Sequence, residues 1–153
     1  MINVLKAYNN LKDKPFGKWM FSKAVSWTAP YFRTVNPTVI ELRDKYGKVK
    51  MKKRWSVTNH IGTVHAIAMC NLAEYVAGMT IEASIPKHLR WIPAGMEVKY
   101  LKKAETNLTA SCTLEIDDWD KVRDCIIHVP VLDDNGQTVF TADINMYVSK
   151  RKK

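Results

Sequence analysis

The amino-acid sequence predicts an α+β fold in which one long, buried central helix is enclosed by an antiparallel sheet. Three observations lead to this fold class. The chain has 153 residues, 46% of them hydrophobic, which suits one soluble domain with a substantial core. Residues 64–81 are apolar on all sides of a helix, as is typical of a helix surrounded by protein. The segments after this helix alternate like strands and are separated by turns.

Two helices are predicted before the sheet, over residues 2–13 and 16–28. The second shows helical spacing of aromatic and aliphatic residues and ends before Pro30, because a proline disfavours helical geometry in the residue before it. A hairpin is predicted over 38–55, with its turn at 44–47. Its second strand alternates lysines with apolar residues. This pattern is more typical of a half-exposed strand than of a binding motif.

An antiparallel meander is predicted after the central helix. A strong Asn-Gly hairpin turn at 134–136 precedes its last strand. The predicted strands are 87–92, 95–104, 106–117, 122–132 and 138–149. No β-α-β alternation and no glycine-rich phosphate loop occurs, which makes the doubly wound nucleotide-binding folds poor candidates. We therefore divide the single domain 1–153 into N-terminal helices (1–34), a core (35–150) and a basic tail (151–153).

The net charge of +9, from 24 Lys and Arg against 15 Asp and Glu, indicates either a solvated basic surface or an anionic partner. Nucleic acid, an anionic membrane face and a phosphate-rich small molecule are the candidates. The charges are dispersed and no groove-reading motif is present, so no nucleic-acid partner is predicted. Asn71, Glu74 and Glu82 also interrupt the apolar stretch, which argues against a membrane span.

Three cysteines with no metal-type spacing predict neither a disulfide framework nor a zinc site. We therefore expect no metal and no cofactor. No secretory signal precedes the first helix, so the expected location is the reducing cytoplasm.

Glu74 lies in the middle of the apolar helix, between Ala73 and Tyr75. Removing an ionised carboxylate from water costs several kcal/mol unless it has partners. A carboxylate in such a place is a candidate catalytic residue. The alternatives are a structural ion pair and a side chain that reaches solvent.

The start of the same helix offers a second candidate. The first backbone N–H groups of a helix have no intrahelical partner and lie at its positive end. At Ala66 such a group can hold the oxyanion formed from a thioester or ester carbonyl. Ala66 and Glu74 are eight residues apart, or about 12 Å along the axis, so one carbonyl cannot reach both in one chain. If both act, two subunits with antiparallel helices share the site, which predicts a two-fold dimer.

The spacing of Asn59, His65 and Glu74 resembles the signature of hotdog-fold acyl-CoA thioesterases of the phenylacetate-pathway type. In that family an Asn lies six residues before a His-Gly-Gly, and an Asp or Glu lies nine residues after the His; both spacings match. The resemblance covers about 35–150 and is greatest to a less characterised branch with N-terminal helices. It implies the hotdog fold, a long central helix wrapped by a curved antiparallel sheet, and a dimer or dimer of dimers.

The resemblance also implies roles for individual residues in the hydrolysis of acyl-CoA to free acid and CoA without a metal. Glu74 would be general base or nucleophile, and the Ala66 N–H would bind the thioester oxygen. Asn59 would orient water or substrate, and His65 would support the helix start. The sequence departs from the family at His65-Ala66-Ile67, where both glycines are replaced. Glycine is needed where backbone must come very close to a ligand.

This departure keeps a second function open, a non-catalytic module that binds acyl-CoA or fatty acid. A hotdog dehydratase is a weaker candidate, since no His-Phe-Pro-Gly type of loop occurs. For the phosphates of coenzyme A we expect Arg90, Lys102 and Lys103, which flank the strand after the central helix. The alternative is that these three are solvated charges at the ends of a strand.

Overall fold

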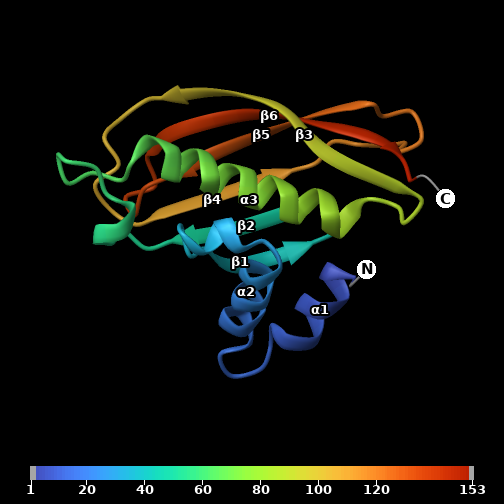
Figure 1. Ribbon diagram of the computed structural model, residues 1–153, viewed down its shortest axis with the longest axis horizontal. Helices are drawn as coiled ribbons and strands as arrows, with labels where there is room; N and C mark the ends of the chain where they lie inside the picture. Colours follow the sequence, from blue (N-terminus) through green and yellow to red (C-terminus); the bar gives the residue numbers. More distant parts are fainter. Residues whose placement is uncertain (1–2, 152–153) are drawn as a thin grey trace.

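The computed structural model describes residues 3–151 and confirms the predicted α+β fold class (Figure 1). The helices are α1 Val4–Leu11, α2 Gly17–Thr28 and α3 Ala66–Ser84, with short 3-10 turns η1 Pro30–Arg33 and η2 Trp55–Val57. The strands are β1 Thr38–Arg43, β2 Tyr46–Met51, β3 Leu89–Tyr100, β4 Leu108–Thr113, β5 Asp124–Leu132 and β6 Thr138–Lys150. The predictions for residue 2 and for the last two lysines of the tail lie outside the described residues.

One antiparallel sheet has the strand order β1-β2-β4-β5-β6-β3. Figure 1 shows α3 lying along this sheet, with α1 and α2 beside the β1 edge. The central strands alternate buried and half-exposed or exposed residues, as expected for a sheet with one face on the core and one toward water. The elements therefore form two main layers, the sheet and α3, with the N-terminal helices added outside.

The central helix is enclosed, as its uniform apolarity predicts. Its buried residues lie on several sides, because the sheet covers one side and the N-terminal segment contacts another. The helix ends at Ser84, and Ile85 is already extended in front of Pro86, as proline requires. Within the described residues, no helix has both the length and the apolarity to cross a membrane.

The predicted hairpin is present, but its turn is shorter than expected. Only Asp44 and Lys45 separate β1 from β2, and Lys45 adopts a left-handed φ of 60°. Gly47 belongs to β2 rather than to the turn. A Cβ atom there would lie 2.2 Å from Oγ1 of Thr80 on α3. Glycine is thus required at 47 because the helix packs directly on the strand, not because the chain reverses.

The two strands predicted at 87–92 and 95–104 were wrong as separate elements, because β3 is continuous. A register shift between Pro93 and Gly95 in its pairing with β6 accommodates the proline. Proline has no N–H to donate and is tolerated on an edge strand or at a bulge. β3 is such an edge, and its other side is unpaired in the described chain. Apolar side chains are exposed along it, with Ile92 at 56% and Tyr100 at 50%.

Candidate active site

In the described part of the chain, the start of α3 presents two free backbone donors, at Ala66 and Ala68. His65 is the N-cap, and its Nδ1 accepts a hydrogen bond of 3.1 Å from the Ile67 N–H. This bond requires a neutral imidazole with the proton on the other nitrogen. Among residues 3–151 the N–H groups of Ala66 and Ala68 have no acceptor, and Ala68 is buried. The positive end of a 19-residue helix therefore offers the Ala66 amide to a ligand.

The loop before α3 owes its shape to Asn59. Its Oδ1 accepts from the Thr63 N–H at 3.1 Å, and its Nδ2 donates to Thr63 Oγ1 at 2.8 Å. The Val64 N–H then donates to the Ala104 carbonyl at 2.8 Å and anchors the loop. Both ends of the Asn59 amide are thus engaged within the loop. In this arrangement Asn59 sets the position of the helix start.

Glu74 lies half-buried on an apolar cavity of about 430 Å³ between α1, α2, η1, α3 and β3. Within the described chain its carboxylate makes no hydrogen bond and no ion pair. The second carboxylate of the cavity, Glu82, accepts a 2.8 Å hydrogen bond from Trp91 Nε1. The remaining lining residues are Val4, Val25, Thr28, Ala29, Phe32, Tyr75, Gly78, Met79 and Pro93. Glu74 is therefore available to a bound ligand, and Glu82 is committed to Trp91.

Tyr75, beside Glu74, is only 2% exposed, and its hydroxyl has no hydrogen-bond partner among the described residues. Its ring packs edge-on against Phe32 of η1, with centroids 5.2 Å apart. Burial raises the pKa of this phenol above its usual value of 10.0, because the charged form is poorly solvated there. The aromatic pair holds η1 against α3 and closes one side of the cavity.

We expect Tyr75→Phe to leave the free energy of unfolding unchanged or to raise it by up to about 1 kcal/mol. The substitution removes a buried hydroxyl that gains no hydrogen bond on folding and loses its bonds to water. Urea titration monitored by circular dichroism measures the effect, and Phe32→Leu, which removes the ring contact instead, is the destabilising comparison. If Tyr75→Phe instead lowers the free energy of unfolding by more than about 1 kcal/mol, the hydroxyl has a hydrogen-bond partner in the folded protein.

The residues predicted to bind the coenzyme A phosphates lie at opposite ends of β3. Arg90 Nε donates to Ser149 Oγ at 3.1 Å, and Lys102 Nζ donates to Gln137 Oε1 at 2.8 Å. Lys102 and Lys103 follow the strand, twelve residues beyond Arg90, or roughly 40 Å in extended chain. Within one chain these side chains cannot bind the same phosphate. The described residues also contain no group of three His, Cys, Asp or Glu side chains that could hold a metal ion.

Residues 17–148 match the sequence pattern of the family described as a domain of unknown function, DUF4442. The chain belongs to the DUF4442 family. A crystal structure from a genomics project is 40% identical to the DUF4442 chain, covers 98% of it and 100% of its own chain, and has a TM-score of 0.85. No curated protein matches the sequence.

More distant solved structures share the fold of the DUF4442 chain. A probable thioesterase from Pseudomonas aeruginosa is 16% identical, with 82% of this chain and 91% of its own covered and a TM-score of 0.73. A hypothetical thioesterase from Streptococcus pneumoniae, solved with coenzyme A, is 19% identical, with 76% and 91% covered and a TM-score of 0.65. These similarities confirm the predicted hotdog fold of the DUF4442 chain.

Sequence reasoning missed how the cavity beside Glu74 is closed. The N-terminal helices were predicted, but no pattern indicated that η1 would pack on α3 through Phe32 and Tyr75. Nor did any signal indicate the hydrogen bond between Glu82 and Trp91, although it leaves Glu74 as the free carboxylate. Such contacts join residues distant in sequence, and neither local periodicity nor spacing encodes them.

Proposed function

We propose that the DUF4442 chain hydrolyses acyl-CoA thioesters to the free acid and coenzyme A. The observation that carries this proposal is the unpartnered carboxylate of Glu74 on an apolar cavity of the central helix. A free carboxylate next to an apolar cavity suits a reaction in which an acyl chain is bound and water is activated. The names of the distant neighbours, thioesterases that include one solved with coenzyme A, favour the same activity.

In the proposed reaction Glu74 takes a proton from water, whose oxygen attacks the thioester carbonyl carbon. The carbonyl oxygen becomes an oxyanion and accepts a hydrogen bond from the Ala66 N–H at the positive end of α3. Collapse of the tetrahedral intermediate breaks the C–S bond, and the proton held by Glu74 passes to the leaving sulfur. Direct attack by the carboxylate on the carbonyl is the variant of this scheme. His65 and Asn59 act by holding the helix start in place.

The proposal requires two chains. Ala66 and Glu74 lie on the same helix about 12 Å apart along its axis, so the site combines the helix start of one subunit with Glu74 of the other. The free edge of β3 suits such an assembly, since an unpaired edge strand is a template for a second strand. The exposed apolar side chains of β3, among them Ile92 and Met96, would be covered by the partner. We therefore propose a two-fold dimer or a dimer of dimers.

A panel of acyl-CoA esters, aliphatic of increasing length and aromatic, tests the activity. We expect continuous release of free coenzyme A, detected with a thiol reagent, at enzyme concentrations far below that of the ester. The apolar cavity predicts that kcat/KM rises from acetyl-CoA to longer or aromatic esters, because the acyl group removes more apolar surface from water. Binding of one ester per site without thiol release would contradict hydrolysis.

The second candidate is a module that binds acyl-CoA or fatty acid without turnover. It is favoured by Ala66 and Ile67, which stand where the phenylacetate-pathway thioesterases that the sequence resembles have two glycines, and by the hydrogen bond that occupies the Ile67 N–H. The bonded Ile67 N–H is then not available to stabilise an oxyanion. Isothermal titration under conditions without thiol release separates this function from hydrolysis.

A further inference from the structure

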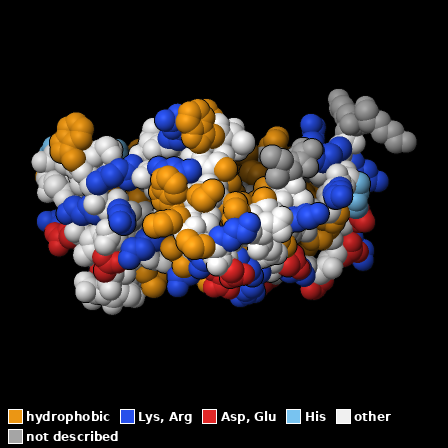
Figure 2. Space-filling view, turned by 90° about the horizontal axis from the view of Figure 1, so that it is seen from below, with side chains coloured by type: hydrophobic (Ala, Val, Ile, Leu, Met, Phe, Trp, Pro, Cys, Tyr) orange, Lys and Arg blue, Asp and Glu red, His pale blue; other side chains and the backbone are white. Residues whose placement is uncertain are grey.

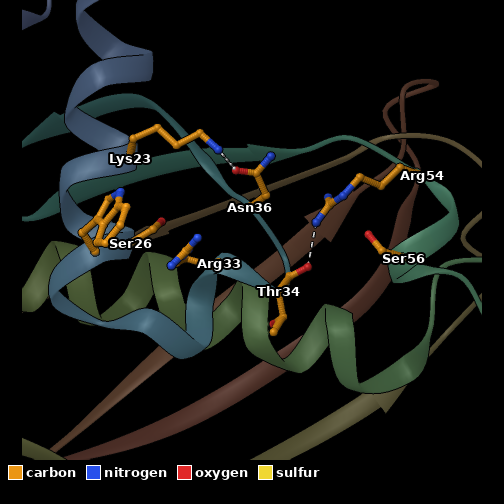
Figure 3. A pocket seen from close by; sticks show the side chains of 8 residues that line it. Lys23, Ser26, Arg33, Thr34, Asn36, Arg54 and Ser56 are labelled. Atoms are coloured by element: carbon orange, nitrogen blue, oxygen red, sulfur yellow. Dashed lines mark hydrogen bonds between the residues drawn. The ribbon is translucent and has the colours of Figure 1, made fainter.

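A second cavity, of about 480 Å³, lies between α2, η1 and the chain just before η2 (Figure 3). It is basic, whereas the cavity at Glu74 is apolar. Its lining residues are Lys23, Ser26, Trp27, Arg33, Thr34, Asn36, Arg54 and Ser56. Three of these eight side chains are cations and none is acidic, so we define the set as the basic pocket. Figure 2, seen from the side of α1 and α2, shows Lys and Arg side chains around apolar ones on this face.

The three cations come from separate elements and are positioned by neutral partners. Lys23 Nζ on α2 donates to Asn36 Oδ1 at 2.6 Å. Arg54 donates from Nη1 and Nη2 to the carbonyls of residues 35 and 34, at 3.1 and 2.6 Å. The Arg33 guanidinium lies over the Trp27 ring, 4.7 Å from its centroid. In Figure 3 the labelled Lys23 and Arg54 side chains extend toward Asn36 from opposite sides, and Arg33 lies below Lys23.

These cations lack counter-charges. Within residues 3–151 none of the three forms an ion pair with a carboxylate. Partial burial lowers the pKa of Arg54, because the charged guanidinium has lost water without gaining an anion. Arg54 still has three N–H groups beyond those that bind the carbonyls. Like charges held together in a concave site create a positive potential that attracts anions.

The aromatic ring narrows the choice of anion. One guanidinium group can bind two phosphate oxygens at once. Exposed aromatic rings and arginine planes provide surfaces on which a nucleic-acid base can stack. Trp27 is 69% exposed although Arg33 covers one face. A phosphorylated nucleoside fits both properties, whereas inorganic phosphate would leave the ring unused.

The basic pocket also leads toward the start of α3. It shares Thr34 and Ser56 with a smaller cavity of about 180 Å³. The lining of that cavity includes His65 and Ala68, which flank the first turn of α3. A long ligand with its phosphates in the basic pocket can therefore extend to the helix end where the Ala66 N–H is free.

We propose that the basic pocket binds the phosphorylated adenosine of coenzyme A, with its thioester arm directed through the smaller cavity to the start of α3. This assignment rests on the proposed function, because the proposed function identifies the whole ligand as an acyl-CoA. Nucleotide binding itself needs no turnover, so an experiment can contradict the pocket assignment and the proposed hydrolysis independently. The rival location for the phosphates is the pair of β3 ends, at Arg90 and at Lys102 with Lys103.

Isothermal titration with adenosine 3′,5′-bisphosphate at low ionic strength tests the pocket directly. We expect saturable binding that Arg33→Gln weakens by about tenfold or more, as for the loss of a charge-assisted phosphate contact. Lys23→Gln should weaken it similarly, and it serves as the second variant should Arg33→Gln unfold. The matched control is the double variant Lys102→Gln, Lys103→Gln, which removes two charges outside the pocket and should change binding by less than about twofold. Unchanged thermal unfolding of each variant shows that the fold is intact.

A second experiment measures steady-state kinetics with a CoA ester and with the corresponding pantetheine ester. Arg33→Gln should raise KM for the CoA ester and leave the pantetheine ester unaffected, because the latter lacks the nucleotide. Loss of bisphosphate binding in the Lys102, Lys103 variant with retention in Arg33→Gln would overturn the assignment in favour of the β3 ends. Tighter binding of a single-stranded RNA oligomer than of the bisphosphate, also lost in Arg33→Gln, would overturn it in favour of nucleic acid. If the bisphosphate binds through Arg33 but no ester is hydrolysed, the pocket stands and the proposed function fails.

Discussion

We expect Glu74→Gln to lower kcat for acyl-CoA hydrolysis by at least about 100-fold, the usual loss when an acid–base group is removed. The amide has the shape of the carboxylate but cannot accept a proton from water at neutral pH. Glu74 makes no hydrogen bond or ion pair within the described residues, so the substitution breaks no polar interaction there. The loss should therefore appear in kcat, with the unfolding midpoint unchanged, in parallel thiol-release and thermal-unfolding measurements.

Glu82→Gln provides the matched control, because Glu82 lines the same cavity and carries the same charge. Its carboxylate already accepts the Trp91 indole N–H, and the glutamine carbonyl oxygen can accept this bond in its place. We expect kcat to change by only a few-fold. If Glu82→Gln loses as much activity as Glu74→Gln, the loss is caused by removing a negative charge from the cavity and not by removing a specific base. If Glu74→Gln retains full turnover, Glu74 has no part in the mechanism.

The central helix was predictable from local properties, and so was its carboxylate. A segment that is apolar on all sides must be enclosed, and Glu74 is costly there under any fold. The free amide at Ala66 also follows from where such a helix begins. The resemblance supplied the fold from the spacing of Asn59, His65 and Glu74, since that spacing reflects one loop and two helical turns.

The rest depended on contacts between distant segments. Lys23, Arg33 and Arg54 are dispersed among other basic residues in the sequence, and only the packing of α2 and η1 brings them to one pocket. The continuity of β3 depended on its pairing with β6, which accommodates Pro93 at a bulge. Gly47 looked like a turn residue because glycines often are, and the proximity of Thr80 on α3 became visible only in three dimensions.

We expect Ala66→Pro to lower kcat by roughly 100- to 1,000-fold, the loss seen when one oxyanion donor is removed. Proline deletes the N–H of residue 66 and little else, since this first helical position is where proline is best tolerated. His65 before it already has an extended ψ of 139°, as a residue preceding proline requires. Thermal unfolding checks that the helix is retained, and Asn71→Pro, in the second turn where the N–H is bonded within the helix, is the comparison in which destabilisation is expected.

Co-expression of Ala66→Pro and Glu74→Gln chains with different affinity tags then tests whether the site is shared. Half of the dimers in an equal mixture carry one chain of each kind. If Ala66 and Glu74 act from opposite subunits, each mixed dimer has one site with both residues intact and one site with neither. Activity should return to about a quarter of the wild-type value, all of it in the doubly tagged fraction. If both residues act within one chain, every site keeps one defect and the mixed dimers stay as inactive as their parents, and the dimer-interface mechanism falls with that result.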